Sequence, residues 1–248
     1  MAATPEQTII PTVYTLSSSA AFRILWALEE IADSGREIKY NVVQISRRSG
    51  PPYKQLKEQF PIGKSPIVTL ETVDGSPPPT VQLKPGVLSE ARAILRYIAD
   101  TFSNGIWEPD AEDKGRDTFF LEFGSSTLTN KVDFVLLTEV LPQMLPFGPR
   151  QLAQLVMAPL SYYFKNDHKD IFQLLEDSLS DERPWFAGKK LGLSDLNIIF
   201  GMDMAVHRGY FDPAKYPKVA KWHKTVIERP AYKRSLEKGG KYNLAKFL

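Results

Sequence analysis

The stretch that decides the fold reads Gly63-Lys64-Ser65-Pro66-Ile67-Val68 and places a proline at the start of an apolar strand. Proline has no N–H, so Pro66 must open its strand, lie on a sheet edge or carry a cis bond. Only about 5–6% of X–Pro bonds in folded proteins are cis, so this residue alone indicates an ordinary trans proline. After a hairpin signal the chain reads Leu88-Ser89-Glu90-Ala91-Arg92-Ala93-Ile94, with an acidic group at the start of an amphipathic helix. Together the two stretches suit a small zwitterionic peptide.

Strand and helix signals alternate around this stretch through the first hundred residues. Their order, βαβ and then ββα, predicts an α/β domain with a small mixed four-stranded sheet. The apolar arc of the first helix is too wide for a helix covered on one side, so we expect it to be packed from two sides. The predicted strands are Thr12–Leu16, Ile38–Ile45, Pro66–Val73 and Thr80–Lys84, and the predicted helices are Ala20–Asp33, Tyr53–Phe60 and a segment from Leu88 onward.

The rest of the chain is helical in pattern. Leu196 to Val206 is apolar nearly all round, which is typical of the central helix of a bundle. Just before it, Gly192-Leu193-Ser194-Asp195 fits a capping box in which Asp195 reaches back to the N-cap N–H, a role in folding. We predict an α/β domain over residues 1–102, a linker over 103–112 and an all-α helical bundle over 113–248. Its periodic segments lie near residues 111–140, 150–166, 170–180, 194–208 and 217–228.

Composition narrows the class of protein. The chain has 31 Lys and Arg and 29 Asp and Glu residues, and this near-balance argues against a nucleic-acid-binding surface. It contains no cysteine, which excludes disulfides, thiolate metal sites and cysteine nucleophiles. We find no signal-peptide pattern and no apolar run of the roughly 18–20 residues that a membrane span needs. We therefore expect a cytoplasmic protein.

The order of motifs resembles that of the cytosolic glutathione S-transferases along nearly the whole chain. The N-terminal motifs above are followed by Pro184-Trp185-Phe186-Ala187-Gly188 before Leu191-Gly192-Leu193-Ser194-Asp195, and then by Tyr216-Pro217 through Trp222 to Arg229-Pro230. The run from Ser19 to Trp26 is similar to fungal members of the serine-type branch. The resemblance implies a thioredoxin-like N-terminal domain that binds glutathione.

Three serines, Ser17, Ser18 and Ser19, stand between the first strand and the first helix. A serine there is a preferred N-cap, which stabilises a helix by roughly 1 kcal/mol. The resemblance implies that another of these hydroxyls donates a hydrogen bond to the sulfur of glutathione and favours the thiolate. In serine-type relatives that serine lies four residues before a helical arginine. Arg23 therefore indicates Ser19 as the catalytic residue, with Ser18 second and Ser17 last.

The resemblance also assigns the glutathione contacts. Pro66 is then cis, and Ser65 pairs through its backbone with the cysteinyl unit, while Lys64 contacts the glycine carboxylate. Glu90 holds the α-amino group, and the α-carboxylate lies over the helix N-terminus. The family's usual serine is replaced by Ala91, which keeps the N–H and loses a hydroxyl donor. From the residues alone, Lys64 is a solvated lysine and Glu90 a first-turn acid favoured by the helix dipole.

The function that follows is conjugation of glutathione, as co-substrate, to a small apolar electrophile. Peroxide reduction by the same thiolate is a further expectation, as are a role in detoxification and a homodimer. The three histidines have no metal-ligand spacing, so we expect no metal. Phe119, Phe120 and Phe123 either line the electrophile pocket or pack in the bundle. The alternative is a non-catalytic ligand carrier or regulatory module with the same fold.

Overall fold

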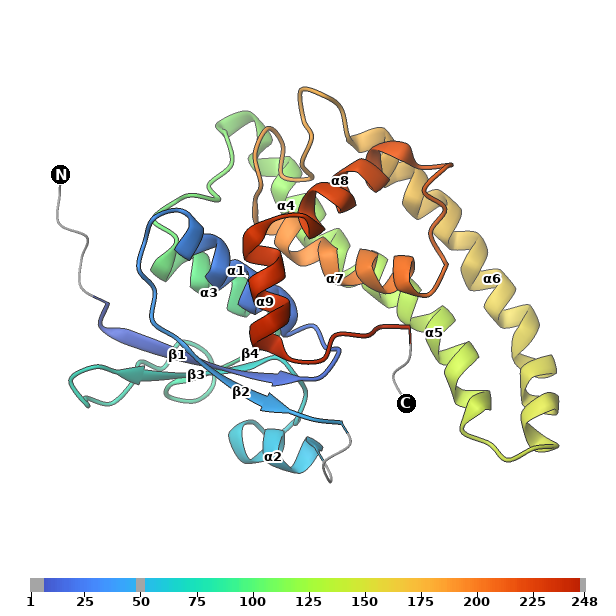
Figure 1. Ribbon diagram of the computed structural model, residues 1–248, viewed down its shortest axis with the longest axis horizontal. Coiled ribbons are helices and arrows are strands. Elements are labelled where there is room, and N and C mark those ends of the chain that lie inside the picture. The colour runs from blue at the N-terminus through green and yellow to red at the C-terminus, as the bar shows by residue number, and fades with distance from the viewer. Residues whose placement is uncertain (1–6, 48–51, 246–248) are drawn as a thin grey trace. The chain divides into compact units, whose positions relative to one another are not determined.

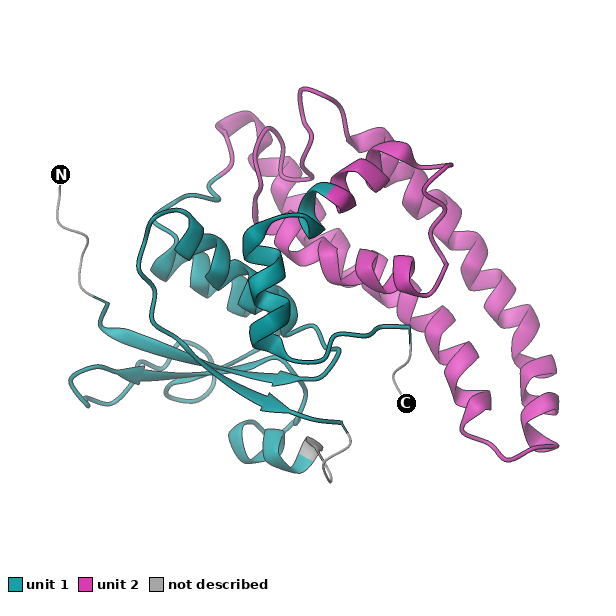
Figure 2. Cartoon of the chain, viewed as in Figure 1, with its two compact units in different colours: residues 1–108, 225–248 teal, residues 109–224 magenta. Residues whose placement is uncertain are grey.

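The computed structural model describes residues 7–47 and 52–245. The chain forms two compact units, one of residues 1–108 with 225–248 and one of residues 109–224 (Figures 1 and 2). The last stretch of the chain thus belongs to the first unit. In the described residues no helix combines the length and the apolar character that crossing a membrane requires.

The first unit is built on a mixed four-stranded sheet, as predicted. Its strand order is β2-β1-β3-β4. β1 runs parallel to β2 and antiparallel to β3, and β3 runs antiparallel to β4. This is the βαβ-ββα order of a thioredoxin-like domain. The strands are β1 Ile9–Leu16, β2 Asn41–Ile45, β3 Ile67–Thr72 and β4 Val87–Ser89.

The prediction of a fourth strand over Thr80–Lys84 is wrong, because the fourth strand lies further along the chain, at Val87–Ser89. The side-chain amide of Gln82 hydrogen-bonds to both backbone groups of Ser89. Its Nε2 donates to the Ser89 carbonyl at 3.0 Å, and its Oε1 accepts the Ser89 N–H at 2.9 Å. A side chain thus replaces a neighbouring strand at this sheet edge. Leu88, expected as the first apolar position of the next helix, lies inside β4, and the helix begins at Ala91.

The first helix is buried on nearly every side, as its apolar arc predicted. All residues from Phe22 through Ile31 are buried, and the helix contacts β1, a helix beside it and the last helix of the chain. The last helix lies beyond the segments that periodicity predicted. The helices of this unit are α1 Phe22–Asp33, α2 Pro52–Gln59, α3 Ala91–Phe102 and α9 Pro230–Gly239.

α9 packs against α1 (Figure 1), and two glutamates on α1 form ion pairs with it and with the residue before it. Glu29 is 2% exposed and accepts hydrogen bonds from Arg234 Nε at 2.6 Å and Lys238 Nζ at 2.5 Å. Glu30 pairs bidentately with Arg229, through Nε at 2.5 Å and the terminal nitrogen at 2.6 Å. Bidentate, charge-assisted bonds of this kind are among the stronger hydrogen bonds in proteins.

The charge of Glu29 is favoured by these partners. Burial raises the pKa of Glu29, but hydrogen bonds from Lys238, Tyr40 and Arg234 outweigh that effect, so its pKa lies below the usual value. Burial and the hydrogen bond to Glu29 raise the pKa of Tyr40. The tyrosine therefore stays protonated and donates to the carboxylate.

The second unit is helical. α6 is one 30-residue helix where periodicity predicted two segments. The segment predicted near residues 111–140 consists of four successive helical elements, η1, α4, η2 and α5. α7 is the central helix, and every residue from Leu193 through Ala205 is buried, as predicted. The elements are η1 Ala111–Asp113, α4 Lys114–Phe123, the π-helical η2 Gly124–Thr129, α5 Asn130–Gln143, α6 Pro149–Ser178, α7 Leu193–His207 and α8 Pro217–Ile227, which ends in the first unit.

Glycines allow η2 and α7 to pack closely. A methyl group on Gly124 would lie 2.9 Å from Ile198 Cγ1, and one on Gly201 would lie 3.0 Å from Leu128 Cγ. Asn197 of α7 donates to the Leu121 carbonyl at 2.7 Å, at the point where the helix changes its hydrogen-bond pattern. The asparagine thus ties α7 to the last turn of α4 before the π turn.

The predicted capping box is confirmed. Asp195 Oδ2 accepts the Gly192 N–H at 3.1 Å, and the carboxylate also accepts the N–H groups of Phe186 and Ala187 and the indole N–H of Trp222. Burial raises the pKa of Asp195 to about 6. Because four donors surround it inside the helical unit, Asp195 has a structural role.

Candidate functional site

The strand register gathers three of the predicted site segments at one end of the sheet. Tyr14 near the end of β1 pairs with Ile67 at the start of β3, and Ile67 pairs with Ser89 at the end of β4. The loop after β1, the residues before β3 and the N-terminus of α3 therefore share that end. These are the segments that carry the serines, Ser65-Pro66 and Glu90-Ala91.

The Ser65–Pro66 bond is cis, which confirms the expectation from the family resemblance. Pro66 is buried at the mouth of β3. The hydroxyl of Ser65 joins the strands here: it accepts the Leu16 N–H at 3.3 Å and lies 3.3 Å from the Tyr14 carbonyl. Ser65 is thus fixed against the end of β1.

Ser19 is the serine that reaches Ser65. Their Oγ atoms lie 3.0 Å apart, and Ser19 is only 7% exposed. Ser19 Oγ also accepts the Ala21 N–H at 3.3 Å. The expectation that one serine caps the helix is wrong, because α1 begins at Phe22 after Ala21, which makes no side-chain cap bond.

Ser17 and Ser18 have other partners. Ser17 Oγ donates to the Ile45 carbonyl at 3.3 Å, at the end of β2. Ser18 has a φ of 53°, and its Oγ accepts the Asn243 N–H at 2.9 Å. The three hydroxyls therefore point to three different parts of the first unit.

Glu90 and Ala91 lie at the N-terminus of α3. Glu90 is exposed, has a φ of 66° and precedes the first turn of the helix, so the expectation of a first-turn acid is wrong. Ala91 is the first residue of α3 and is buried. Free N–H groups at such an end favour anions. Lys64 is exposed and directly precedes Ser65.

Two contacts of this loop had no signal in the sequence. Arg47, which follows β2, donates from Nε to the Ser17 carbonyl at 2.8 Å. The chain after α9 returns to the loop, and the Lys241 carbonyl accepts the Ser18 N–H at 2.9 Å. Neither a lone arginine nor a polar tail follows a pattern that predicts such contacts.

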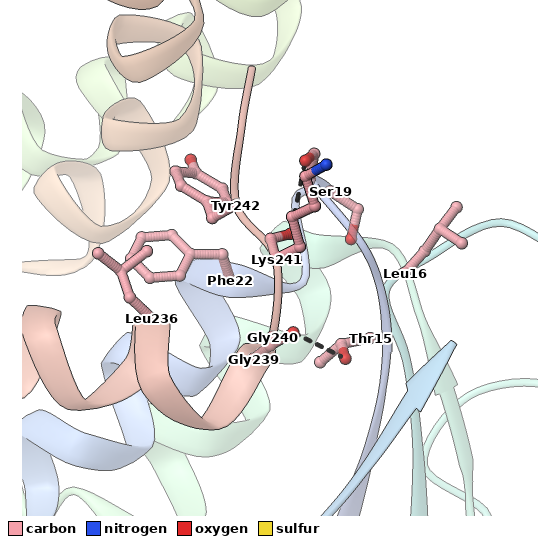
Figure 3. Close-up of a pocket in the computed structure, with 10 residues that line it drawn as sticks. Thr15, Leu16, Ser19, Phe22, Leu236, Gly239, Gly240, Lys241 and Tyr242 are labelled. Carbon is pink, nitrogen blue, oxygen red and sulfur yellow. Dashed lines mark hydrogen bonds between the residues drawn. The ribbon is translucent and has the colours of Figure 1, made fainter. Parts of the chain in front are cut away.

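A cavity beneath the loop lies between β1, α1 and the chain after α9 (Figure 3). Its volume of about 10 Å³ is near the minimum that holds one water molecule, so it is not a binding site for a tripeptide. The residues that line it are Thr15, Leu16, Ser18, Ser19, Phe22, Leu236, Gly239, Gly240, Lys241 and Tyr242.

Three phenylalanines on α4 were candidates for an electrophile pocket. Phe120 and Phe123 are buried in the second unit, whereas Phe119 is half exposed. The rings of Phe119 and Phe123 stack with centroids 5.7 Å apart. Phe120 and Phe123 therefore pack in the bundle, and Phe119 alone presents a ring to the surface.

The acidic residues Asp110, Glu112 and Asp113 form a cluster in which one oxygen of each lies within 4.8 Å of the others. Arg183 Nε donates to Asp113 at 2.9 Å and Lys189 Nζ to Glu112 at 2.7 Å. Two of the three carboxylates, those of Glu112 and Asp113, therefore form ion pairs with cations of the chain.

Comparison with known proteins gives matches over both units. Residues 12–100 match the family model described as glutathione S-transferase, N-terminal domain, and residues 163–230 match the glutathione S-transferase, C-terminal domain. Glutathione S-transferase 1 of Saccharomyces cerevisiae is 27% identical over 91% of this chain and 94% of the relative. Glutathione S-transferase 3 of Schizosaccharomyces pombe is 25% identical over 91% of this chain and 86% of the relative.

Solved structures give the same fold. The glutathione transferase URE2P8 from Phanerochaete chrysosporium, determined with oxidized glutathione, superposes with a TM-score of 0.67 at 19% identity. The superposition covers 95% of this chain and 97% of that one. Because the N-terminal and C-terminal domain models both match in order, the chain belongs to the glutathione S-transferase family.

Proposed function

We propose that this chain is a serine-type glutathione transferase that conjugates glutathione to small apolar electrophiles. The observation that carries the proposal is the 3.0 Å contact between Ser19 Oγ and Ser65 Oγ, next to the cis bond of Pro66. In the proposed complex the cysteinyl unit of glutathione pairs with the backbone of Ser65. Its sulfur then lies beside the Ser19 hydroxyl, which donates a hydrogen bond to the thiolate.

The other contacts follow from charge. Glu90 is exposed at the N-cap of α3, where its carboxylate pairs with the α-amino group of the γ-glutamyl unit. The α-carboxylate accepts the backbone N–H of Ala91 at the helix N-terminus. Lys64, exposed one residue before Ser65, pairs with the glycine carboxylate.

The chemistry rests on the sulfur of glutathione. A thiol of pKa about 8.5 is mostly protonated at neutral pH, and a donor aimed at the sulfur lowers that pKa. The thiolate then forms a carbon–sulfur bond with the electrophile, and the leaving group departs with its electron pair or, in an addition, the product takes up a proton. The half-exposed ring of Phe119 is the candidate contact for an apolar electrophile.

The same thiolate supports glutathione-dependent peroxide reduction. It attacks one oxygen of a hydroperoxide, the O–O bond breaks, and the alcohol leaves after taking up a proton, which gives the sulfenic acid of glutathione. A second glutathione then attacks the sulfenic sulfur, and water leaves as glutathione disulfide forms. We further propose a cytoplasmic homodimer with a role in detoxification.

The alternative function is a non-catalytic glutathione-binding carrier or regulatory module. The residue that favours it is Ala91, because the family's usual hydroxyl donor to the γ-glutamyl end is missing there. One neutral hydrogen bond is worth about 0.5–1.5 kcal/mol, so its loss weakens glutathione binding without abolishing it.

Ultraviolet difference titration with glutathione tests the proposal, since thiolate absorbance against pH gives the thiol pKa in the complex. We expect a pKa well below 8.5 in the wild type and a rise of about 1–2 units in Ser19→Ala, because a hydrogen bond to a charged group contributes about 1.5–3 kcal/mol. Conjugation kcat/KM falls by about 10- to 100-fold in the same variant.

Ser17→Ala is the matched control, because it removes a neighbouring hydroxyl that is bonded to the Ile45 carbonyl. It keeps the lowered thiol pKa. Glutathione that binds the wild type with an unshifted thiol pKa supports the carrier or regulatory alternative. An unchanged pKa and kcat/KM in Ser19→Ala would remove Ser19 from the mechanism.

A further inference from the structure

The chain after α9 returns to the loop that carries the three serines. α9 ends at Gly239, and Gly240 turns the chain with a φ of 82°. The ring of Tyr242 then packs on Phe22 with centroids 4.5 Å apart, and Leu244 is fully buried. Figure 3 shows this segment beside the loop. We call residues 240–244 the C-terminal segment.

The C-terminal segment binds Ser18 through two of its polar groups. The Ser18 N–H donates to the Lys241 carbonyl at 2.9 Å, and the Ser18 Oγ accepts the Asn243 N–H at 2.9 Å. Just before the segment, the Gly239 carbonyl lies 3.5 Å from Thr15 Oγ1 (Figure 3). Ser18 is thus held to the C-terminal segment by one backbone bond and one bond to its hydroxyl.

Ser18 adopts an uncommon backbone conformation. Its φ of 53° lies in the left-handed region, which residues other than glycine rarely occupy unless the surroundings hold them there. The torsion angles of Ser18 set the direction of the next residue, Ser19. The 3.0 Å contact of Ser19 with Ser65 therefore depends on the conformation in which Ser18 is held.

The helix that directly precedes the C-terminal segment, α9, is held in place by ion pairs and a hydrogen bond. Glu29 and Glu30 hold α9 through Arg234, Lys238 and Arg229. Lys238 is also bound through its carbonyl, which accepts Gln44 Nε2 at 2.8 Å, so the end of α9 is fixed to β2. The segment thus starts from a fixed point close to the loop.

We propose that the C-terminal segment is a positioning element of the glutathione site, acting through Ser18 on the direction of the Ser19 hydroxyl. The inference rests on the proposed function, since it assigns the activation of glutathione to Ser19. Ser18 is then a positioning residue, and its hydroxyl serves as an acceptor for the Asn243 N–H.

Asn243→Pro tests the proposal by removing the N–H that bonds to Ser18. It is compared with Asn243→Ala, which loses the side chain and keeps the N–H. A chain that ends at Gly239 removes the whole segment. We expect Asn243→Pro and the shortened chain to raise the thiol pKa of bound glutathione by about 1 unit relative to Asn243→Ala, with a tenfold lower kcat/KM. Both effects appear mainly in kcat, because the glutathione contacts of Ser65 and Glu90 remain.

Amide hydrogen exchange at Ser18 and Ser19 is the second measurement, and it needs no glutathione. The Ser18 amide exchanges slowly in the wild type and at least tenfold faster in Asn243→Pro and in the shortened chain. Unchanged exchange, or an unchanged thiol pKa in folded variants, overturns the proposal. A wild type that binds glutathione with an unshifted thiol pKa refutes the proposed function instead, while the exchange data still show whether the segment holds the loop.

Discussion

Three neighbouring serines carry the same hydroxyl group, but each hydroxyl has a different hydrogen-bond partner. Ser17 bonds to the end of β2, Ser18 to the C-terminal segment and Ser19 to the residue before the cis proline. A hydroxyl is both donor and acceptor, so the loop's contacts decide what each one does. Of the three, Ser19 alone lies against Ser65, the residue that the proposed function assigns to the cysteinyl unit.

Ala91 gives a prediction at the same scale. Ala91→Ser restores the hydroxyl at the N-terminus of α3, where it donates to the α-carboxylate of glutathione. We expect glutathione to bind about 2- to 10-fold more tightly, which corresponds to one hydrogen bond of about 0.5–1.5 kcal/mol. Isothermal titration calorimetry with glutathione measures the change.

The thiol pKa is the internal control for Ala91→Ser, because the γ-glutamyl end is remote from the sulfur. It stays at the wild-type value while the affinity rises. A variant with equal or weaker affinity would show that the α-carboxylate does not lie at this helix end.

At the scale of elements, Glu29 links α9 to α1. Glu29→Gln removes a buried charge that accepts bonds from Arg234 and Lys238, and we expect a loss of about 1–3 kcal/mol in the free energy of unfolding at pH 7. The loss stays in this range because both cations are partly exposed and regain water. Urea denaturation measures it, with the exposed Glu37→Gln as control.

The pH dependence of this effect has a defined sign. Burial raises the pKa of Glu29, but its hydrogen bonds from Lys238, Tyr40 and Arg234 lower it further than burial raises it. A carboxylate with a lowered native pKa stabilises the fold above its unfolded pKa of about 4.3, and this stability is lost as the pH falls through the native value. The difference between wild type and Glu29→Gln therefore shrinks from pH 7 to pH 3. A constant difference would contradict the assignment.

The close packing of η2 on α7 gives another prediction. Alanine is favoured over glycine in helices by about 1 kcal/mol, yet Gly124→Ala would place a methyl group 2.9 Å from Ile198 Cγ1 and 3.0 Å from Asn197 Nδ2. We expect it to destabilise the protein by about 1–3 kcal/mol, as overpacking does. The matched variant is Gly115→Ala on α4, which has open space around it and gains up to about 1 kcal/mol. Thermal unfolding of both variants decides whether packing or propensity dominates.

Local patterns predicted the elements whose hydrogen bonds are local. The wide apolar arc of α1 and the buried run of α7 follow from periodicity, and Asp195 follows from a capping box. β4 was misplaced because a side chain, Gln82, replaces a strand at its edge, and no propensity describes that bond.

The residues of the candidate site that belong to sequence motifs were predicted from the sequence. Ser19, Ser65 and Pro66 come from such motifs, and the sheet register brings them together. The bond from the Ser18 N–H to the Lys241 carbonyl spans most of the chain, and it joins two backbone groups rather than side chains. The types of the residues in the sequence therefore do not predict such a contact.

At the scale of the whole molecule, the helical unit exposes an apolar surface. On α6 the apolar residues Leu152, Leu155 and Val156 are exposed at helical spacing, while Gln154, Ser161 and Lys165 line a hollow against α5. Large exposed apolar patches mark interaction sites, and interfaces are enriched in aromatic residues and Met and poor in charge. The other large apolar residues exposed on α5, on α6 and between these helices are Phe134, Leu137, Leu141, Met144, Leu145, Phe147, Leu160, Tyr162, Tyr163 and Leu174.

This surface supports the proposed homodimer, and light scattering after gel filtration tests it. We expect the wild type to have twice the mass of one chain. Leu155→Glu places a charge in the apolar face and gives a single-chain mass. Gln154→Glu adds the same charge one residue earlier, a turn of about 100° around the helix, and remains dimeric. A wild type of single-chain mass would refute the homodimer, and a dimeric Leu155→Glu would move the interface away from α6. Because both variants add one charge to the same exposed helix, a difference between them reports which face is covered rather than a general loss of solubility.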